Sequence, residues 1–237
     1  MPPAPVEYAQ AATKSVAIVS LLQPLSADLR RQVFSLAKNA SLAHFVLIDN
    51  RRMLYLKCTA AVQKKLGLPK THLTDALPSE APLGNWYVNR FELGRRKAYL
   101  FMSEPTLLSF ILLQGAKPVT VETLPQMLIG GLEQLLEMGG LGEDAIKRAL
   151  AHYHTGAFAK TASRSDLGSM NDLMLRYQWV IERDGGLAQC DLTRIIMGTN
   201  DMPQRRLGWC SSWEVTRSKL QLLNPPTPLP ADSPRPA

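Results

Sequence analysis

The chain has 237 residues, of which 46% are hydrophobic, 20% charged and 7% aromatic, a composition that excludes collagen-like, coiled-coil and wholly disordered proteins. No apolar run approaches the roughly 20 residues of a membrane-spanning helix, so no membrane partner is expected. The 27 Lys and Arg residues exceed the 20 Asp and Glu residues, and the net charge of +7 permits binding to nucleic acid or another acidic partner without demonstrating it.

Residues 1–52 are predicted to be an N-terminal appendage. They begin with an aperiodic run rich in Ala and Pro, followed by a helix capped by Ser26 and a strand over 42–48. A polar joint at 50–52 separates them from a new apolar stretch that opens at Met53. We therefore expect the domain to start near Met53, and an over-long gene prediction is one interpretation of the preceding residues.

The residues after Met53 predict a β-rich first half. Residues 54–58 indicate a short strand, and residues 60–66 a helix. Residues 86–93 alternate between apolar and polar side chains, whereas 98–102 and 106–113 are continuously apolar, as strands covered on both faces are. Because turn-sized joints connect these last three segments, they predict a three-stranded antiparallel meander.

The second half is predicted to be mainly helical. Leucines at helical spacing indicate a helix over 124–136, in which Gly130-Gly131 requires either close packing or a kink. The further elements expected are helices over 143–153, 170–183 and 213–222 and a last strand over 190–197. The sum is an α+β domain over 53–222, with an antiparallel β-meander packed against a block of helices, and a Pro-rich disordered tail over 223–237.

The cysteines and histidines give neither a disulfide framework nor a metal motif. Cys58, Cys190 and Cys210 are far apart and odd in number, and no CxxC pair indicates zinc. His152 and His154 are two residues apart, so on a helix they would point to different faces. The chain start lacks the regions of a secretory signal, and we expect a cytoplasmic protein with no metal and no cofactor.

The turn between the first two strands of the meander is one candidate binding site. Arg95, Arg96 and Lys97 follow Gly94 at its tip, and Arg90 lies across the turn with two aromatic residues nearby. Arginine and aromatic side chains are the types that hold phosphates and stack bases. The alternative interpretation is a solvated turn whose charges keep a sheet edge soluble.

A second candidate precedes the helix expected at 170–183. Backbone N–H groups at a helix start attract anions, and the nearby basic, hydroxyl and amide side chains would strengthen that attraction. The candidate binding residues of this segment are Lys160, Arg164, Ser169 and Asn171.

This second segment also has a purely structural interpretation. Ser169 and Asp172 have the spacing of a capping box, and Gly168 permits a turn before it. Asp166 and Asp172 would also repel a phosphate. Capping is therefore the alternative to anion binding.

No recognised catalytic motif accompanies these candidates. The chain lacks a GxxxxGK[ST] phosphate loop, a GxGxxG segment after a strand and a GxSxG nucleophile elbow. Glu104 is the only turn carboxylate near the basic tip in the predicted arrangement, and spacing alone does not make it a base.

Several short segments together carry a resemblance to a known family. They are residues 53–59, 83–89, 94–97 with Leu100-Phe101, 103–106 and, most specifically, 163–165 with 167–172. In these segments the chain resembles a bacterial domain-of-unknown-function family over about residues 53–222. The family more often has Asn before Glu104 and a small apolar residue in place of Asp166. The resemblance implies a domain start near Met53 and no reaction.

Three functions remain open from the sequence. The first is a binding or regulatory module whose basic tip meets an acidic partner, with nucleic acid favoured over an acidic protein. The alternatives are an enzyme acting on a phosphate-containing substrate, nuclease-like or toxin-like, and a protein-interaction domain without a ligand site. Residues 1–52 hold six basic and three acidic residues, whereas 53–222 hold twenty and sixteen, so the domain itself is only mildly basic.

Overall fold

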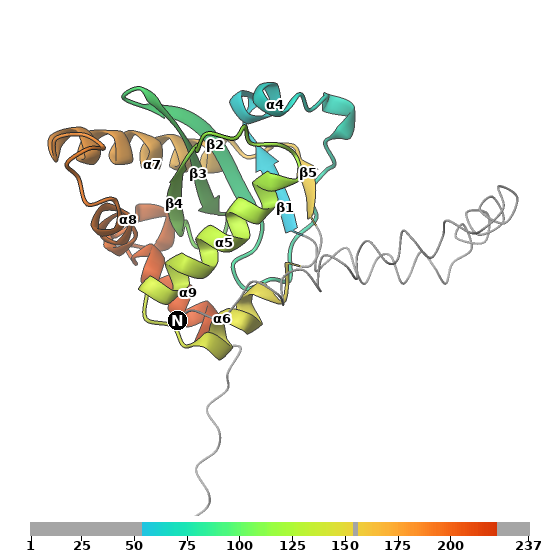
Figure 1. Ribbon diagram of the computed structural model, residues 1–237. Coiled ribbons are helices and arrows are strands. Elements are labelled where there is room, and N and C mark those ends of the chain that lie inside the picture. Colours follow the sequence, from blue (N-terminus) through green and yellow to red (C-terminus); the bar gives the residue numbers. More distant parts are fainter. Residues whose placement is uncertain (1–53, 154–155, 222–237) are drawn as a thin grey trace, which may run out of the picture. The chain divides into compact units, whose positions relative to one another are not determined.

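The computed structural model describes residues 54–153 and 156–221 (Figure 1). The chain divides into two compact units, Met1–Asp49 and Asn50–Ala237, and every described residue belongs to the second. The predictions that lie outside the described residues are the appendage at 1–52, with its helix and strand, and the tail at 223–237.

A five-stranded mixed sheet forms the centre of the described unit, in the order β4-β3-β2-β1-β5. β2 (Trp86–Leu93), β3 (Arg96–Ser103) and β4 (Ser109–Leu113) form the predicted antiparallel meander. β1 (Leu54–Cys58) pairs in parallel with β2 on one side and with β5 (Gly156–Ala159) on the other. β1 is therefore an inner strand, although it precedes the meander in sequence.

Helices cover both faces of this sheet, and the fold is α+β as predicted (Figure 1). α5 lies against one face, where Gly131 meets the ring of Phe110 in β4. α7 lies against the other, where Tyr177 Oη donates to Ser109 O at 3.1 Å. The helices are α4 (Ala60–Leu66), α5 (Thr123–Met138), α6 (Glu143–Leu150), α7 (Arg164–Arg183), α8 (Leu192–Asp201) and α9 (Ser212–Gln221), with 3₁₀ turns η1 (Lys70–His72) and η2 (Arg205–Leu207).

Two of the predicted strands need correction. The strand predicted over 190–197 is wrong, because these residues enter α8, whose first turn is capped by Asp191 Oδ1 accepting from Arg194 N at 3.0 Å. The third strand of the meander starts at Ser109 rather than Thr106. Thr106 belongs to a turn in which its Oγ1 donates to Ser103 Oγ at 2.8 Å.

Candidate functional site

The β2–β3 hairpin tip exposes two of the four basic residues predicted there. Gly94 has a φ of 56°, a left-handed conformation that glycine adopts without strain, and it forms the predicted turn. Arg95 and Arg96 are exposed, and neither forms an ion pair within the described part of the chain. Arg96 Nη2 donates only to Gln114 O, at 3.4 Å. Both guanidinium groups are thus available to a ligand.

The other two predicted basic residues are engaged elsewhere. Lys97 forms an ion pair with Glu92, its partner in register on β2. Arg90 is half-buried and points toward the α5 face, because its neighbour Asn89 donates from Nδ2 to Met174 Sδ of α7 at 3.4 Å. The structure therefore does not bring Arg90 together with the arginines of the tip.

A groove of about 790 Å³ lies between the hairpin tip and the C-terminal half of α7. Gln178 of α7 ties the two elements together by donating from Nε2 to Glu92 O at 3.0 Å. Leu175 and Trp179 are one helical turn apart, line the groove and are 59% and 60% exposed. The groove therefore combines apolar surface with the two arginines of the tip.

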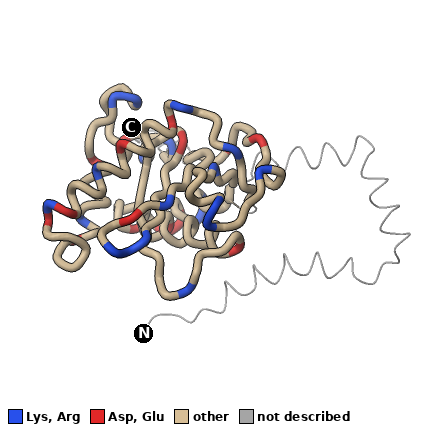
Figure 2. Tube along the Cα trace, turned by 90° about the horizontal axis from the view of Figure 1, so that it is seen from above, with Lys and Arg blue, Asp and Glu red and all other residues tan. Residues whose placement is uncertain are grey.

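The charges around this groove are few and mixed. The guanidinium of Arg183 lies over the Trp179 ring, 4.9 Å from its centroid, and helps to hold the indole in place. Glu182 lines the groove and forms no ion pair with another described residue. Figure 2 shows Lys and Arg positions distributed around the described residues with Asp and Glu between them. The groove has local positive charge at the tip rather than a broad basic face.

Residues 55–215, which include the hairpin and α7, match the family described as a domain of unknown function (DUF6933). The chain belongs to this family. The resemblance predicted from the sequence is thereby confirmed. No curated protein and no solved structure matches the chain. The function of this DUF6933 domain therefore has to be inferred from its own side chains.

The second candidate segment lies inside a helix of the DUF6933 domain. α7 begins several residues earlier than predicted, so the turn at Gly168 and the capping box of Ser169 and Asp172 are wrong. Ser163 is the actual N-cap, and its Oγ accepts from Asp166 N at 3.2 Å. The signal was present in the sequence, because Ser163 and Asp166 also have capping-box spacing.

Asp166 is a buried carboxylate at the start of α7, and its side chain is 3% exposed. Its Oδ2 accepts from Tyr87 Oη at 2.9 Å, and it forms an ion pair with Arg206 of η2. Burial alone would raise the pKa of Asp166, but hydrogen bonds from Ser163, Tyr87 and Arg206 lower it below the ordinary 3.8. The predicted phosphate site depended on the positively polarised N-terminus of a helix. The carboxylate of Asp166 already lies at that end of α7.

The remaining residues of the second segment do not converge with the hairpin tip. Lys160 Nζ forms an ion pair with Asp75 at 3.0 Å. Ser169 Oγ accepts from Arg206 Nη1 at 3.3 Å and borders a separate hollow of about 460 Å³. The two candidate regions are thus different places on the molecule. The other predicted binding residues of the segment, both exposed on α7, are Arg164 and Asn171.

One ion pair that the sequence did not predict lies at the C-terminal end of β3. Lys57 Nζ donates to Glu104 Oε1 at 2.6 Å, and the two side chains are 12% and 29% exposed. Glu104 follows β3, so it lies at the opposite end of that strand from the basic tip. The partners are 47 residues apart, and no local spacing indicates the pair.

The described residues form neither a metal-binding cluster nor a membrane-spanning helix. Within 54–153 and 156–221, no three His, Cys, Asp or Glu side chains are grouped so that they could hold a metal ion. In the same part of the chain, no helix combines the length and the apolar character needed to cross a membrane.

Proposed function

We propose that this DUF6933 domain is a protein-interaction module whose groove binds a segment with acidic and apolar side chains. The observation that carries the proposal is Trp179, 60% exposed beside Leu175 in a groove rimmed by two arginines without ion-pair partners among the described residues. Trp and Arg are the residue types that dominate interface hot spots. Adjacent exposed apolar side chains in a groove are also typical of interaction sites.

The groove suits such a segment better than nucleic acid, the partner that the sequence favoured. A nucleic acid strand carries one phosphate per nucleotide and binds along a track of cations. Here Arg95 and Arg96 are the cations that line the groove, and Glu182 would repel phosphates. Leu175 adds aliphatic surface that a stacked base does not require. A segment with one or two carboxylates and a large apolar side chain complements both parts of the groove.

Selection of short random peptides displayed on phage against the full chain tests the proposal. We expect enriched peptides to combine Asp or Glu with Leu, Phe or Trp. In fluorescence anisotropy, Trp179→Ala should weaken binding of a selected peptide about tenfold or more, as loss of a hot-spot side chain does. A double variant with Arg95→Ala and Arg96→Ala should weaken binding of the same peptide and reduce the salt dependence of that binding.

Matched controls separate the groove from general surface effects. Trp209→Ala removes an indole that is 69% exposed outside the groove, and Arg148→Ala removes an exposed arginine of α6; both should bind as the wild type does. Labelled single-stranded RNA and DNA are titrated in parallel. If an oligonucleotide binds in a Trp179-dependent manner while no peptide is enriched, nucleic acid replaces the proposed partner. Binding of neither would reject the groove as an interaction site.

A further inference from the structure

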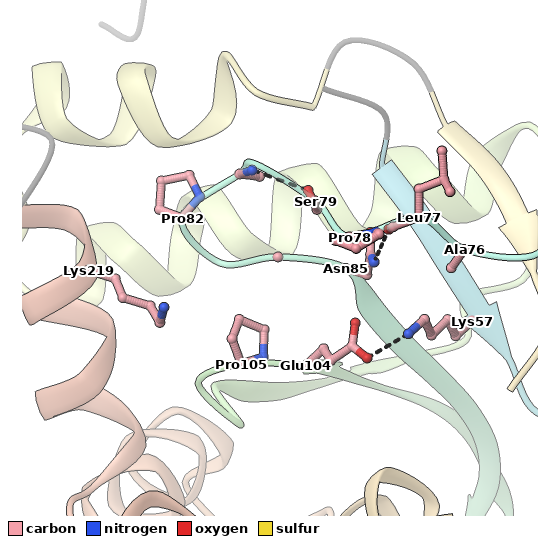
Figure 3. Close-up of a pocket in the computed structure, with 12 residues that line it drawn as sticks. Lys57, Ala76, Leu77, Pro78, Ser79, Pro82, Asn85, Glu104, Pro105 and Lys219 are labelled. Atoms are coloured by element: carbon pink, nitrogen blue, oxygen red, sulfur yellow. Dashed lines mark hydrogen bonds and ion pairs between the residues drawn. The ribbon is translucent and has the colours of Figure 1, made fainter. Parts of the chain in front are cut away.

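A separate cavity of about 380 Å³ lies at the opposite end of β2 and β3 from the hairpin tip (Figure 3). It is bounded by the loop before β2, the turn after β3 and helix α9. The loop and the turn are joined by a hydrogen bond from Glu104 N to Asn85 O at 2.9 Å. The polar residues that line the cavity include Lys57, Asn85, Glu104 and Lys219.

Asn85 presents a buried acceptor without a partner. The residue is 3% exposed, and its Nδ2 donates to Leu77 O at 2.9 Å. This bond fixes the amide orientation, because a flipped amide would place two oxygens face to face. Oδ1 of Asn85 is then buried with no hydrogen-bond partner, an arrangement that is uncommon and costly in folded proteins. A ligand N–H or O–H group would satisfy it.

The charges of the cavity leave one positive charge unmatched. Lys57 and Glu104 form an ion pair in its wall, so their charges balance. Lys219 projects from α9 toward Pro105 across the cavity, and none of the described carboxylates forms an ion pair with it (Figure 3). Lys219 is half-buried as a residue, and its ammonium group, unpaired among the described residues, favours a single negative charge on a bound molecule.

We propose that this cavity binds a small organic anion that also carries a hydroxyl or amino group. The anionic group lies at Lys219, and the donor group of the ligand faces Asn85 Oδ1 and the Glu104 carboxylate. The volume lies within the range of small-molecule sites, which is about 300–1,000 Å³. A carboxylate and a phosphate monoester both satisfy an ammonium group, so the chemistry they share defines the ligand class.

Isothermal titration calorimetry of the full chain with two anionic probes and one uncharged control tests the site. Glycerate supplies a carboxylate with hydroxyl groups, glycerol 3-phosphate supplies a phosphate with the same groups, and glycerol supplies the hydroxyl groups alone. We expect at least one anion to bind with a Kd of about 1 mM or tighter, and glycerol not to bind. The anion that binds identifies the preferred head group.

Two variants assign the binding to this cavity. Lys219→Met keeps the length of the side chain and should weaken binding about tenfold or more. Lys117→Met removes an exposed lysine of the loop between β4 and α5, outside the cavity, and should bind as the wild type does. Asn85→Ala should also weaken binding. If Asn85→Ala fails to fold, Lys219→Met still tests the site. Absence of binding by both anions, or equal binding by Lys219→Met and wild type, would overturn the proposal. Trp179→Ala leaves this cavity intact and should not alter anion binding.

Discussion

Asp166 shows how one buried carboxylate connects three elements of the domain. It lies at the start of α7, accepts a hydrogen bond from Tyr87 of β2 and pairs with Arg206 of η2. The backbone N–H of Asp166 also donates to the N-cap residue Ser163. Asp166 thus takes part both in capping α7 and in holding the helix against the sheet. A buried charge is tolerated when it is paired and hydrogen-bonded in this way. Asp166 therefore has a structural role that its sequence position alone did not reveal.

Replacing Asp166 by Asn keeps the size of the side chain and removes its charge. We expect the free energy of unfolding to fall by about 1–3 kcal/mol at neutral pH, because Arg206 loses its ionic partner. The pKa of Asp166 lies below 3.8 in the folded protein, so its stabilisation is present above that value and is lost as the pH falls through the folded pKa. Urea unfolding at about pH 7 and about pH 3 should show a smaller difference from wild type at the lower pH.

A second carboxylate on the same helix provides the control for this effect. Asp172 is exposed, and Asp172→Asn should change stability by no more than about 0.5 kcal/mol at either pH. An equal loss of stability at both pH values for Asp166→Asn would show that the charge of Asp166 is not what stabilises the fold.

At the scale of elements, α5 contains adjacent glycines in different environments. A Cβ at Gly131 would collide with the Phe110 ring, whereas a Cβ at Gly130 would meet open space. Phe110 cannot easily yield, because it is 2% exposed and stacks on Phe101 with ring centroids 5.1 Å apart. Of the two sequence-based alternatives, a kink or close packing, the structure shows close packing at Gly131.

This pair of glycines gives opposite expectations for the same substitution. Gly130→Ala should raise the free energy of unfolding by about 0.5–1 kcal/mol, because alanine favours the helix. Gly131→Ala should lower it by about 1–3 kcal/mol through overpacking against Phe110. Urea denaturation of the two variants beside wild type measures both effects. Stabilisation by both substitutions would contradict the close approach of α5 to β4.

The elements that the sequence predicts well are those defined by local patterns. The alternation of β2 and the short turns around β3 indicate the meander, because neighbours in sequence pair in space. The apolar run Ile195-Ile196-Met197 is too short to distinguish a strand from a helix, and the helix cap at Asp191 decides it. The place of β1 between β2 and β5 depends on parallel pairing between distant segments, which no local pattern reveals.

The candidate groove was predictable only in part, because it too combines a local pattern with contacts between distant segments. The hairpin tip follows from its turn and its run of basic residues, so Arg95 and Arg96 were identified. Leu175 and Trp179 lie off the helical face of α7 that buries Met170, Leu173, Tyr177 and Ile181, so their helical spacing was an indirect signal of an exposed apolar pair. Tertiary contacts decide which element packs beside the tip, and no local sequence pattern indicates it.

At the scale of the whole molecule, the two proposed sites occupy opposite ends of β2 and β3. The groove lies at the hairpin tip, and the anion cavity lies where β2 begins and β3 ends. No residue is shared between their linings among the described residues. Variants of one site can therefore be assayed without direct change to the other.

The extent of the hydrophobic core leads to a prediction about the domain boundaries. Most buried apolar residues of the described part, from Leu54 to Leu220, form one cluster around the sheet. A fragment from Met53 to Leu222 should therefore fold and unfold cooperatively without the remaining residues, because it retains that core. Circular dichroism should give it a Tm within about 5 °C of the full chain, a shift equivalent to no more than about 1–2 kcal/mol for a domain of this size. A fragment that is unfolded, or that melts without cooperativity, would show instead that residues before Met53 or after Leu222 supply part of the stability.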